Sequence, residues 1–223
     1  MSTHTIQILT ISTALFTSGG IAALSAFNIP QLRSQPASRS LPMLRWLFSR
    51  GSHTAPTGIL FSSAGFAYLA YASVGPAKVS SSSRSSLTQL AHHLTHNTTP
   101  SLFLTASLLT LSAALFTRIM LPTNFELIER NEQLGGAVSK ESARYRAETG
   151  AGPRSAEESV AMKRDVSQWT DVSDPQEKTG REAQGAGEEE RVKVLLSRFE
   201  RLNYVRAGLV GVGGLVGLVA ALG

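Results

Sequence analysis

Residues 101–121, SLFLTASLLTLSAALFTRIML, form an apolar run with one charge, Arg118, between Pro100 and Pro122. As a helix, a run of this length covers about 30 Å at about 1.5 Å per residue, which matches the hydrocarbon core of a bilayer. Proline suits the first turn of a helix and the positions just past its end. The run therefore predicts a membrane-spanning helix and places the chain among integral membrane proteins.

Three further apolar runs, residues 6–27, 57–74 and 205–222, predict three more spans. The first run has no Lys or Arg before it and is longer than a signal-peptide core of about 7–15 residues, which favours a span over a cleaved signal. In the last run, Gly213 and Gly217 either let another helix approach closely or have no packing role. We expect an all-α fold, a bundle of four transmembrane helices.

The charges are divided sharply along the chain. All 16 acidic residues lie between Glu126 and Glu200, and of the 21 basic residues only Lys78 and Arg84 lie between spans 2 and 3. Because basic loops face the cytoplasm, the two odd-numbered loops should be cytoplasmic, in a multi-pass protein of an endomembrane. The termini and residues 75–100 should face a lumen or the outside.

Several classes of function are disfavoured. The basic residues are interleaved with acids and match no nucleic-acid-binding motif, so we expect no nucleic acid partner. The absence of cysteine excludes disulfides, thiolate metal sites and thiol catalysis. His92, His93 and His96 could share a helical turn, but that loop contains no acid to complete a metal site, and we expect none.

Three regions follow from composition. Residues 1–134 hold spans 1–3 and a short interfacial segment at 41–51 around Trp46. Residues 135–187 are charged and poor in aliphatic side chains, so we expect a long disordered loop that offers a site for a cytoplasmic partner. Residues 188–223 should form an amphipathic helix that leads into span 4, with apolar side chains at helical spacing.

Several polar residues, which are costly to place next to hydrocarbon, lie at the predicted cytoplasmic boundary of the membrane. Arg118 and Asn124 end span 3, and Asn203 and Arg206 begin span 4. One interpretation is structural: the arginines extend to the headgroups, while Pro122 stops one helix and Asn124 caps the next. The other is a site, because polar groups near hydrocarbon are expensive unless they are paired or solvated, and they often mark functional sites.

The order of elements resembles the anthrone oxygenase family of small four-helix membrane proteins. The matching pieces are SGGIAALSAFNIPQL at 18–32, Trp46 followed by Gly51, AYLAY at 67–71, LPTNFEL at 121–127 and LNYVRAGLVGVGGLVGL at 202–218. The chain departs from the family in having Phe199 where tryptophan is usual and in the long connection between Asn124 and Asn203.

The resemblance implies a monooxygenase of polyketide secondary metabolism, an oxidoreductase that converts an anthrone to an anthraquinone with O2 and needs no cofactor. It implies a hydrophobic aromatic substrate reached from the lipid bilayer. Its implied catalytic residues are Arg206 for the enolate oxygen, with Asn203 and Asn124 as hydrogen-bonding groups. The implied substrate-binding residues are Thr123, Trp46 and Phe199. A non-catalytic membrane scaffold of the same fold, which binds partners, is the alternative.

Overall fold

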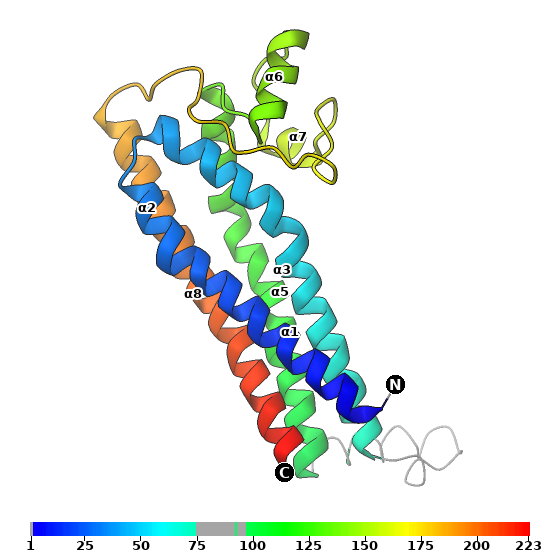
Figure 1. Ribbon diagram of the computed structural model, residues 1–223. Helices are drawn as coiled ribbons and strands as arrows, with labels where there is room; N and C mark the ends of the chain where they lie inside the picture. Colours follow the sequence, from blue (N-terminus) through cyan, green and yellow to red (C-terminus); the bar gives the residue numbers. More distant parts are fainter. Residues whose placement is uncertain (1, 75–91, 93–96) are drawn as a thin grey trace. The chain divides into compact units, whose positions relative to one another are not determined.

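The computed structural model describes residues 2–74, 92 and 97–223, and within these ranges it is helical without a β-strand (Figure 1). The long elements are α1 (Thr3–Ala23), α3 (Ala37–Val74), α5 (Thr98–Gln133) and α8 (Ala186–Leu222). A π-helical turn, η1 (Leu24–Asn28), and α2 (Ile29–Arg33) continue α1, and the short helices α6 (Lys140–Thr149) and α7 (Ala156–Ala161) lie between α5 and α8.

Within the described residues, four helical stretches are long and apolar enough to cross a membrane: Thr3–Arg33, Ala37–Val74, Thr98–Gln133 and Ala186–Leu222. They contain the four predicted spans, and the prediction of an all-α protein with four membrane-spanning helices is confirmed. The amphipathic helix expected before span 4 is also present, as the N-terminal part of α8, where Val192, Leu195, Leu196 and Phe199 are buried.

The helix end expected at Pro122 is wrong, whereas Pro100 lies in the first turn of α5, as expected. Helix α3 continues through Pro56, and α5 continues through Pro122 to Gln133. The segment 41–51, expected as a separate interfacial piece, is likewise part of α3. Proline removes one donor and strains the preceding turn, but a long helix tolerates this where neighbouring groups satisfy the freed carbonyl.

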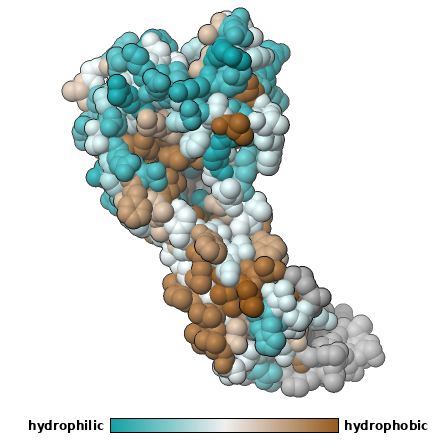
Figure 2. All heavy atoms as spheres, in the orientation of Figure 1, coloured by the Kyte–Doolittle hydropathy of each residue, from teal (hydrophilic) through white to brown (hydrophobic). Residues whose placement is uncertain are grey.

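The chain divides into two compact units, and each long helix contributes to both. The first unit comprises Met1–Ala22, Ala55–Arg118 and Tyr204–Gly223, and the second comprises Ala23–Thr54 and Ile119–Asn203. In Figure 2, brown apolar residues cover much of the first unit, whereas teal polar residues dominate the second. The first unit thus carries a surface suited to lipid.

Close helix packing holds the first unit together. A Cβ at Gly217 would lie 2.2 Å from the ring of Phe66, and one at Gly213 would lie 3.1 Å from the carbonyl of Ala106, so both positions require glycine. This confirms a packing role for the small-xxx-small pair. Between α3 and α5, Ser63 and Ser107 each donate to the other's carbonyl, at 3.1 Å and 2.8 Å.

The second unit overturns the expectation of a disordered loop at 135–187. These residues form α6, α7 and connections around a buried ion-pair cluster. The fully buried carboxylate of Glu132 accepts from Arg146 at 2.9 Å and Arg154 at 3.1 Å, and Arg154 also binds Asp165 at 2.8 Å. The prediction from composition was wrong for two reasons. Glu132, a residue that orders the segment, lies outside it on α5. In addition, charged side chains that are paired can be buried, so a segment with few aliphatic side chains can still be ordered.

Candidate functional site

A π-helical turn brings two distant polar residues together in the second unit. Ser25 lies within η1, and the Nδ2 of Asn203 on α8 donates to its Oγ at 3.1 Å. Both residues are buried, with Asn203 only 1% exposed. Such π-turns occur often at functional sites, because the extra residue turns side chains away from the regular helix pattern.

Ser25 is a site residue that the sequence analysis did not single out. It lies inside SGGIAALSAFNIPQL, the first stretch quoted for the family resemblance. A serine in a predicted span is common and usually bonds to its own helix, so no pattern along the chain distinguishes Ser25. Only its position opposite Asn203 distinguishes it.

Thr123 and Asn124 occupy the interior of α5, one turn or less from Pro122. The proposed cap is therefore absent, because a helix interior offers Asn124 no free backbone donors. The Oδ1 of Asn124 and the Oγ1 of Thr123 are both buried without a hydrogen-bond partner. Buried polar atoms of this kind are rare in native proteins and call for an explanation such as a ligand or an ordered water.

Arg206 follows Asn203 by three residues on the continuous helix α8, so the two side chains project from the same side of that helix. Its Nε is buried and has no hydrogen-bond partner. Arg118, the other arginine of the predicted corner, is exposed and therefore fits the solvated or headgroup-facing role.

The two aromatic candidates are already engaged within the second unit. Trp46 donates its Nε1 proton to the carbonyl of Ser173 at 2.9 Å, and the guanidinium of Arg50 lies 5.3 Å from the centre of its ring system. Phe199 is buried against Phe48, with ring centroids 5.1 Å apart. Neither ring is a free stacking surface in this structure.

Glu126 and His53, two side chains that could in principle accept a proton from a substrate, also have close neighbours. Glu126 accepts from Arg191 at 2.8 Å and 2.7 Å and from Arg130 at 3.1 Å. The ring of His53 lies 3.9 Å from that of Trp169. A carboxylate that accepts from two guanidinium groups is a weak proton acceptor, so Glu126 is better explained as a structural anchor between α5 and α8.

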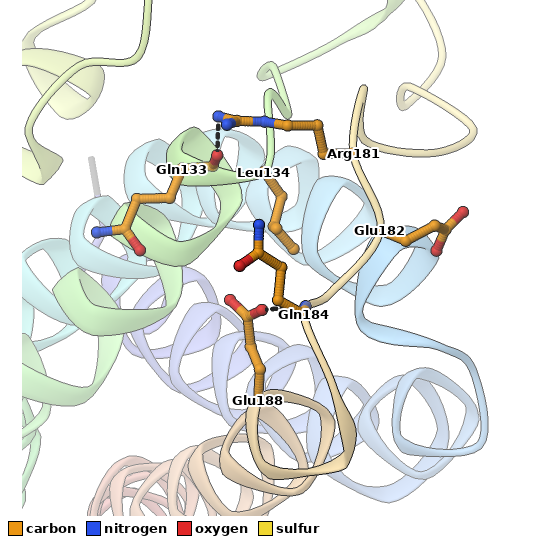
Figure 3. A pocket seen from close by; sticks show the side chains of 6 residues that line it. All are labelled: Gln133, Leu134, Arg181, Glu182, Gln184 and Glu188. Carbon is orange, nitrogen blue, oxygen red and sulfur yellow. Dashed lines mark hydrogen bonds between the residues drawn. The ribbon is translucent and has the colours of Figure 1, made fainter.

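A polar pocket in the second unit lies apart from all of these residues (Figure 3). It is lined by Gln133, Leu134, Arg181, Glu182, Gln184 and Glu188, and within it Arg181 donates to the carbonyl of Gln133. Sites for flat aromatic molecules are lined mostly by apolar side chains. This pocket contains none of the predicted site residues and does not suit such a ligand.

In residues 2–74, 92 and 97–223 there is no group of three or more His, Cys, Asp or Glu side chains placed to hold a metal ion. His93 and His96, two members of the histidine cluster considered in the sequence, lie outside the described residues.

Four apolar helices of membrane-spanning length, with buried polar side chains on α5 and α8, define a multi-pass integral membrane protein. The family model for anthrone oxygenase matches residues 44–216, most of the chain. The chain belongs to the anthrone oxygenase family. The match includes Asn124, Asn203 and Arg206, whereas Ser25 lies before it. No curated protein and no solved structure matches the chain.

Proposed function

We propose that this protein oxidises a membrane-dissolved aromatic anthrone to the corresponding anthraquinone with O2. Loss of a proton from the C10 methylene gives an enolate; that carbon then takes up O2 as a peroxide anion, which regains a proton to form a hydroperoxide. The hydroperoxide loses water and leaves a carbonyl at C10, so that one oxygen atom enters the product. The enolate is electron-rich enough to reduce O2 itself, so the proposed reaction uses no haem, flavin or metal.

The observation that supports this proposal most directly is the pair of buried, unpartnered oxygen atoms on α5, Asn124 Oδ1 and Thr123 Oγ1. An unpaired buried polar atom costs about 1–3 kcal/mol. A substrate phenol that donates a hydrogen bond to either atom would remove this cost. In the proposal, Asn124 and Thr123 therefore accept hydrogen bonds from the hydroxyl groups of a polyketide ring system.

Asn203 and Arg206 supply donors on α8. Asn203 is held by its hydrogen bond to Ser25, and we assign its amide a hydrogen bond to a substrate oxygen. Arg206 has a buried Nε–H without a partner, and a guanidinium carries a permanent positive charge. We assign it the stabilisation of the enolate oxygen, because a fixed charge in a water-poor site strongly favours the anion over the neutral anthrone.

In the proposed function, Trp46 and Phe199 form part of the wall of the substrate-binding site. Each is held by a neighbour, Trp46 by Ser173 and Arg50 and Phe199 by Phe48. A ligand could stack on either ring only after the neighbour moved. Their substitution should therefore raise the KM for the anthrone more than it lowers kcat.

The alternative is a membrane scaffold that keeps the family fold without catalysis. Two observations favour it. The carboxylate of Glu126 accepts hydrogen bonds from two arginines, which makes it a weak base, and residues 135–187 form a structured surface suited to a partner. The two functions make opposite predictions for turnover of an anthrone by the isolated protein.

The test is oxygen consumption by proteoliposomes supplied with emodin anthrone, corrected for spontaneous oxidation in empty liposomes. The wild-type protein should accelerate quinone formation, and Arg206→Ala should lower the rate by a factor on the order of 10²–10³, the usual cost of losing one such donor. Arg201→Ala is the matched control, since Arg201 is exposed on the same helix. A wild-type rate equal to that of empty liposomes would favour the scaffold.

We also propose that the protein resides in an endomembrane with both odd-numbered loops in the cytoplasm, because nearly all basic residues lie there. A pH-sensitive fluorescent reporter fused after Gly223 should then report a lumenal environment. A cytoplasmic signal would reverse the orientation.

A further inference from the structure

The hydroxyl groups along α5 have partners as far as Thr117. Each serine and threonine from Ser101 to Thr117 donates to a main-chain carbonyl, as Thr117 does to Ala113 at 3.1 Å. A bond to the preceding turn is the ordinary way in which a hydroxyl is satisfied inside a helix. Thr123 is 2% exposed and makes no such bond, so its hydroxyl is available to a ligand.

The oxygen atom beside it, Asn124 Oδ1, is a chemically different group. It is also buried and without a partner. A carboxamide oxygen only accepts hydrogen bonds, whereas a hydroxyl such as that of Thr123 both donates and accepts. An oxygen atom of any kind in a ligand can therefore satisfy Thr123, but only an N–H or O–H group can satisfy Asn124. Of the two residues, Asn124 makes the stricter demand on the ligand.

The hydroxyl groups of an anthrone differ in whether they can meet this demand. A hydroxyl at C1 or C8 lies beside the C9 oxygen and donates to it within the molecule. A hydroxyl at any other ring position has no internal acceptor. When such a hydroxyl leaves water for a buried site, it needs an acceptor from the protein.

We propose that the substrate carries a phenolic hydroxyl that is not adjacent to the C9 oxygen, and that Asn124 Oδ1 accepts a hydrogen bond from it. This selection presupposes the proposed oxidation of an anthrone. It makes Asn124 the residue that distinguishes one anthrone from another, because an anthrone without this hydroxyl leaves the amide oxygen unpaired. Thr123 does not distinguish them, since the oxygen atoms at C1, C8 and C9 can also satisfy a hydroxyl.

Two anthrones separate this hydroxyl from the rest of the molecule. Emodin anthrone and chrysophanol anthrone differ at one ring position, where the first has a hydroxyl and the second has hydrogen, and both keep the hydroxyls at C1 and C8. The full-length protein in proteoliposomes is supplied with each compound, and kcat/KM is divided by the rate constant of spontaneous oxidation in empty liposomes. The ratio of the two normalised values measures selection and does not depend on the amount of active protein.

The wild-type ratio should favour emodin anthrone by a factor on the order of 10–100, the cost of leaving one buried acceptor unpaired. Asn124→Leu, which keeps the size of the side chain and removes the acceptor, should bring the ratio close to one. Asn124→Asp, which keeps an acceptor oxygen, should retain the preference. Thr123→Val is the matched control at the adjacent position, and it should lower both values and leave their ratio unchanged.

The outcomes separate the selection from the oxidation itself. A wild-type protein that oxidises both anthrones with a ratio close to one would overturn the selection and leave the proposed function standing. A preference that persists in Asn124→Leu would remove Asn124 from the proposal.

If the wild-type protein oxidises neither anthrone, the proposed function fails, and binding tests the recognition without catalysis. Equilibrium binding of the two quinones, emodin and chrysophanol, is then compared between proteoliposomes and empty liposomes. Tighter binding of emodin that is lost in Asn124→Leu would support hydroxyl recognition by Asn124. Equal binding of the two quinones would overturn it.

Discussion

Asn203 and Ser25 meet through a hydrogen bond of 3.1 Å across 178 positions of sequence, one from α8 and the other from the π-helical turn η1. Both belong to the second unit, and both are buried. The contact orients the amide of an asparagine that the family resemblance had marked. It also gives the π-turn a specific role, since the turn presents Ser25 to that amide.

If this hydrogen bond fixes Asn203, the effects of Ser25→Ala and Asn203→Ala on the free energy of unfolding should not be additive. A buried hydrogen bond within a membrane protein contributes about 0.6 kcal/mol on average and up to about 1.7 kcal/mol. The double variant should therefore be more stable than the sum of the two single losses predicts, by about that amount. Unfolding in mixed micelles of increasing SDS fraction measures it, and strict additivity would show that the two side chains do not depend on each other.

Thr123→Val should leave the protein equally stable or stabilise it, by up to about 1–3 kcal/mol, because it replaces an unpartnered buried hydroxyl with a methyl group of similar size. The same change should lower anthrone turnover if that hydroxyl accepts a hydrogen bond from the substrate. Thermal unfolding and oxygen consumption are measured on one preparation, with Thr117→Val as control, since Thr117 already donates to Ala113. A destabilised and fully active Thr123→Val protein would contradict the proposed role.

Glu132→Ala should loosen residues 135–187 strongly. It removes the acidic partner of Arg146 and leaves Arg154 with Asp165 alone, so buried positive charge is left uncompensated at a cost of about 3–5 kcal/mol. Hydrogen exchange should accelerate across α6 and α7 while the membrane-spanning part of α5 stays protected. Glu148→Ala, which removes an exposed pair with Arg144, should change exchange little, and equal effects of the two variants would refute the cluster's role.

Acidification should destabilise part of the second unit, because it protonates the carboxylate of Asp171. Burial alone would raise the pKa of this carboxyl, but hydrogen bonds from Ser139 and Ser173 outweigh it and lower the pKa below its usual value. The pKa of Asp171 is thus lower in the folded protein than in the unfolded chain, where it is about 3.9. The ionised carboxylate therefore stabilises the fold above about pH 3.9, and this stabilisation is lost as the pH falls through the folded-state pKa.

Protease resistance of the segment 137–175 should therefore decline below about pH 4 in the wild-type protein. Asp171→Asn should lower resistance at neutral pH and flatten the acid-dependent decline. Asp174→Asn is the control, because the side chain of Asp174 is mostly exposed and its carboxylate lies 3.7 Å from the Lys140 ammonium group. An unchanged pH profile in Asp171→Asn would assign the decline to other carboxyl groups.

The candidate site was partly accessible from sequence. Asn124, Asn203 and Arg206 could be selected because polar side chains beside apolar runs are costly, and the family resemblance marked the same positions. Ser25 could not be selected, because a lone serine in a span resembles the many that bond to their own helix. The helix cap proposed for Asn124 is wrong. It assumed that Pro122 ends the helix, whereas α5 continues through this proline.

The disorder expected at 135–187 shows the same limit. Composition counts the side chains within a segment, whereas this segment is ordered by a partner outside it, Glu132 on α5. The exposed Trp169 was visible in the sequence as the one tryptophan of this segment. Its contact with His53 was not.

The sequence by itself determined the four spans and the division between apolar and charged regions, because the length and hydropathy of a helix in lipid are local properties. It also marked the polar residues that are costly at such a boundary. The tertiary structure decided which of those residues have partners, since a hydrogen bond or ion pair depends on which side chains meet in space. Ser25 with Asn203, and Glu132 with Arg146 and Arg154, are pairings that no pattern along the chain specifies.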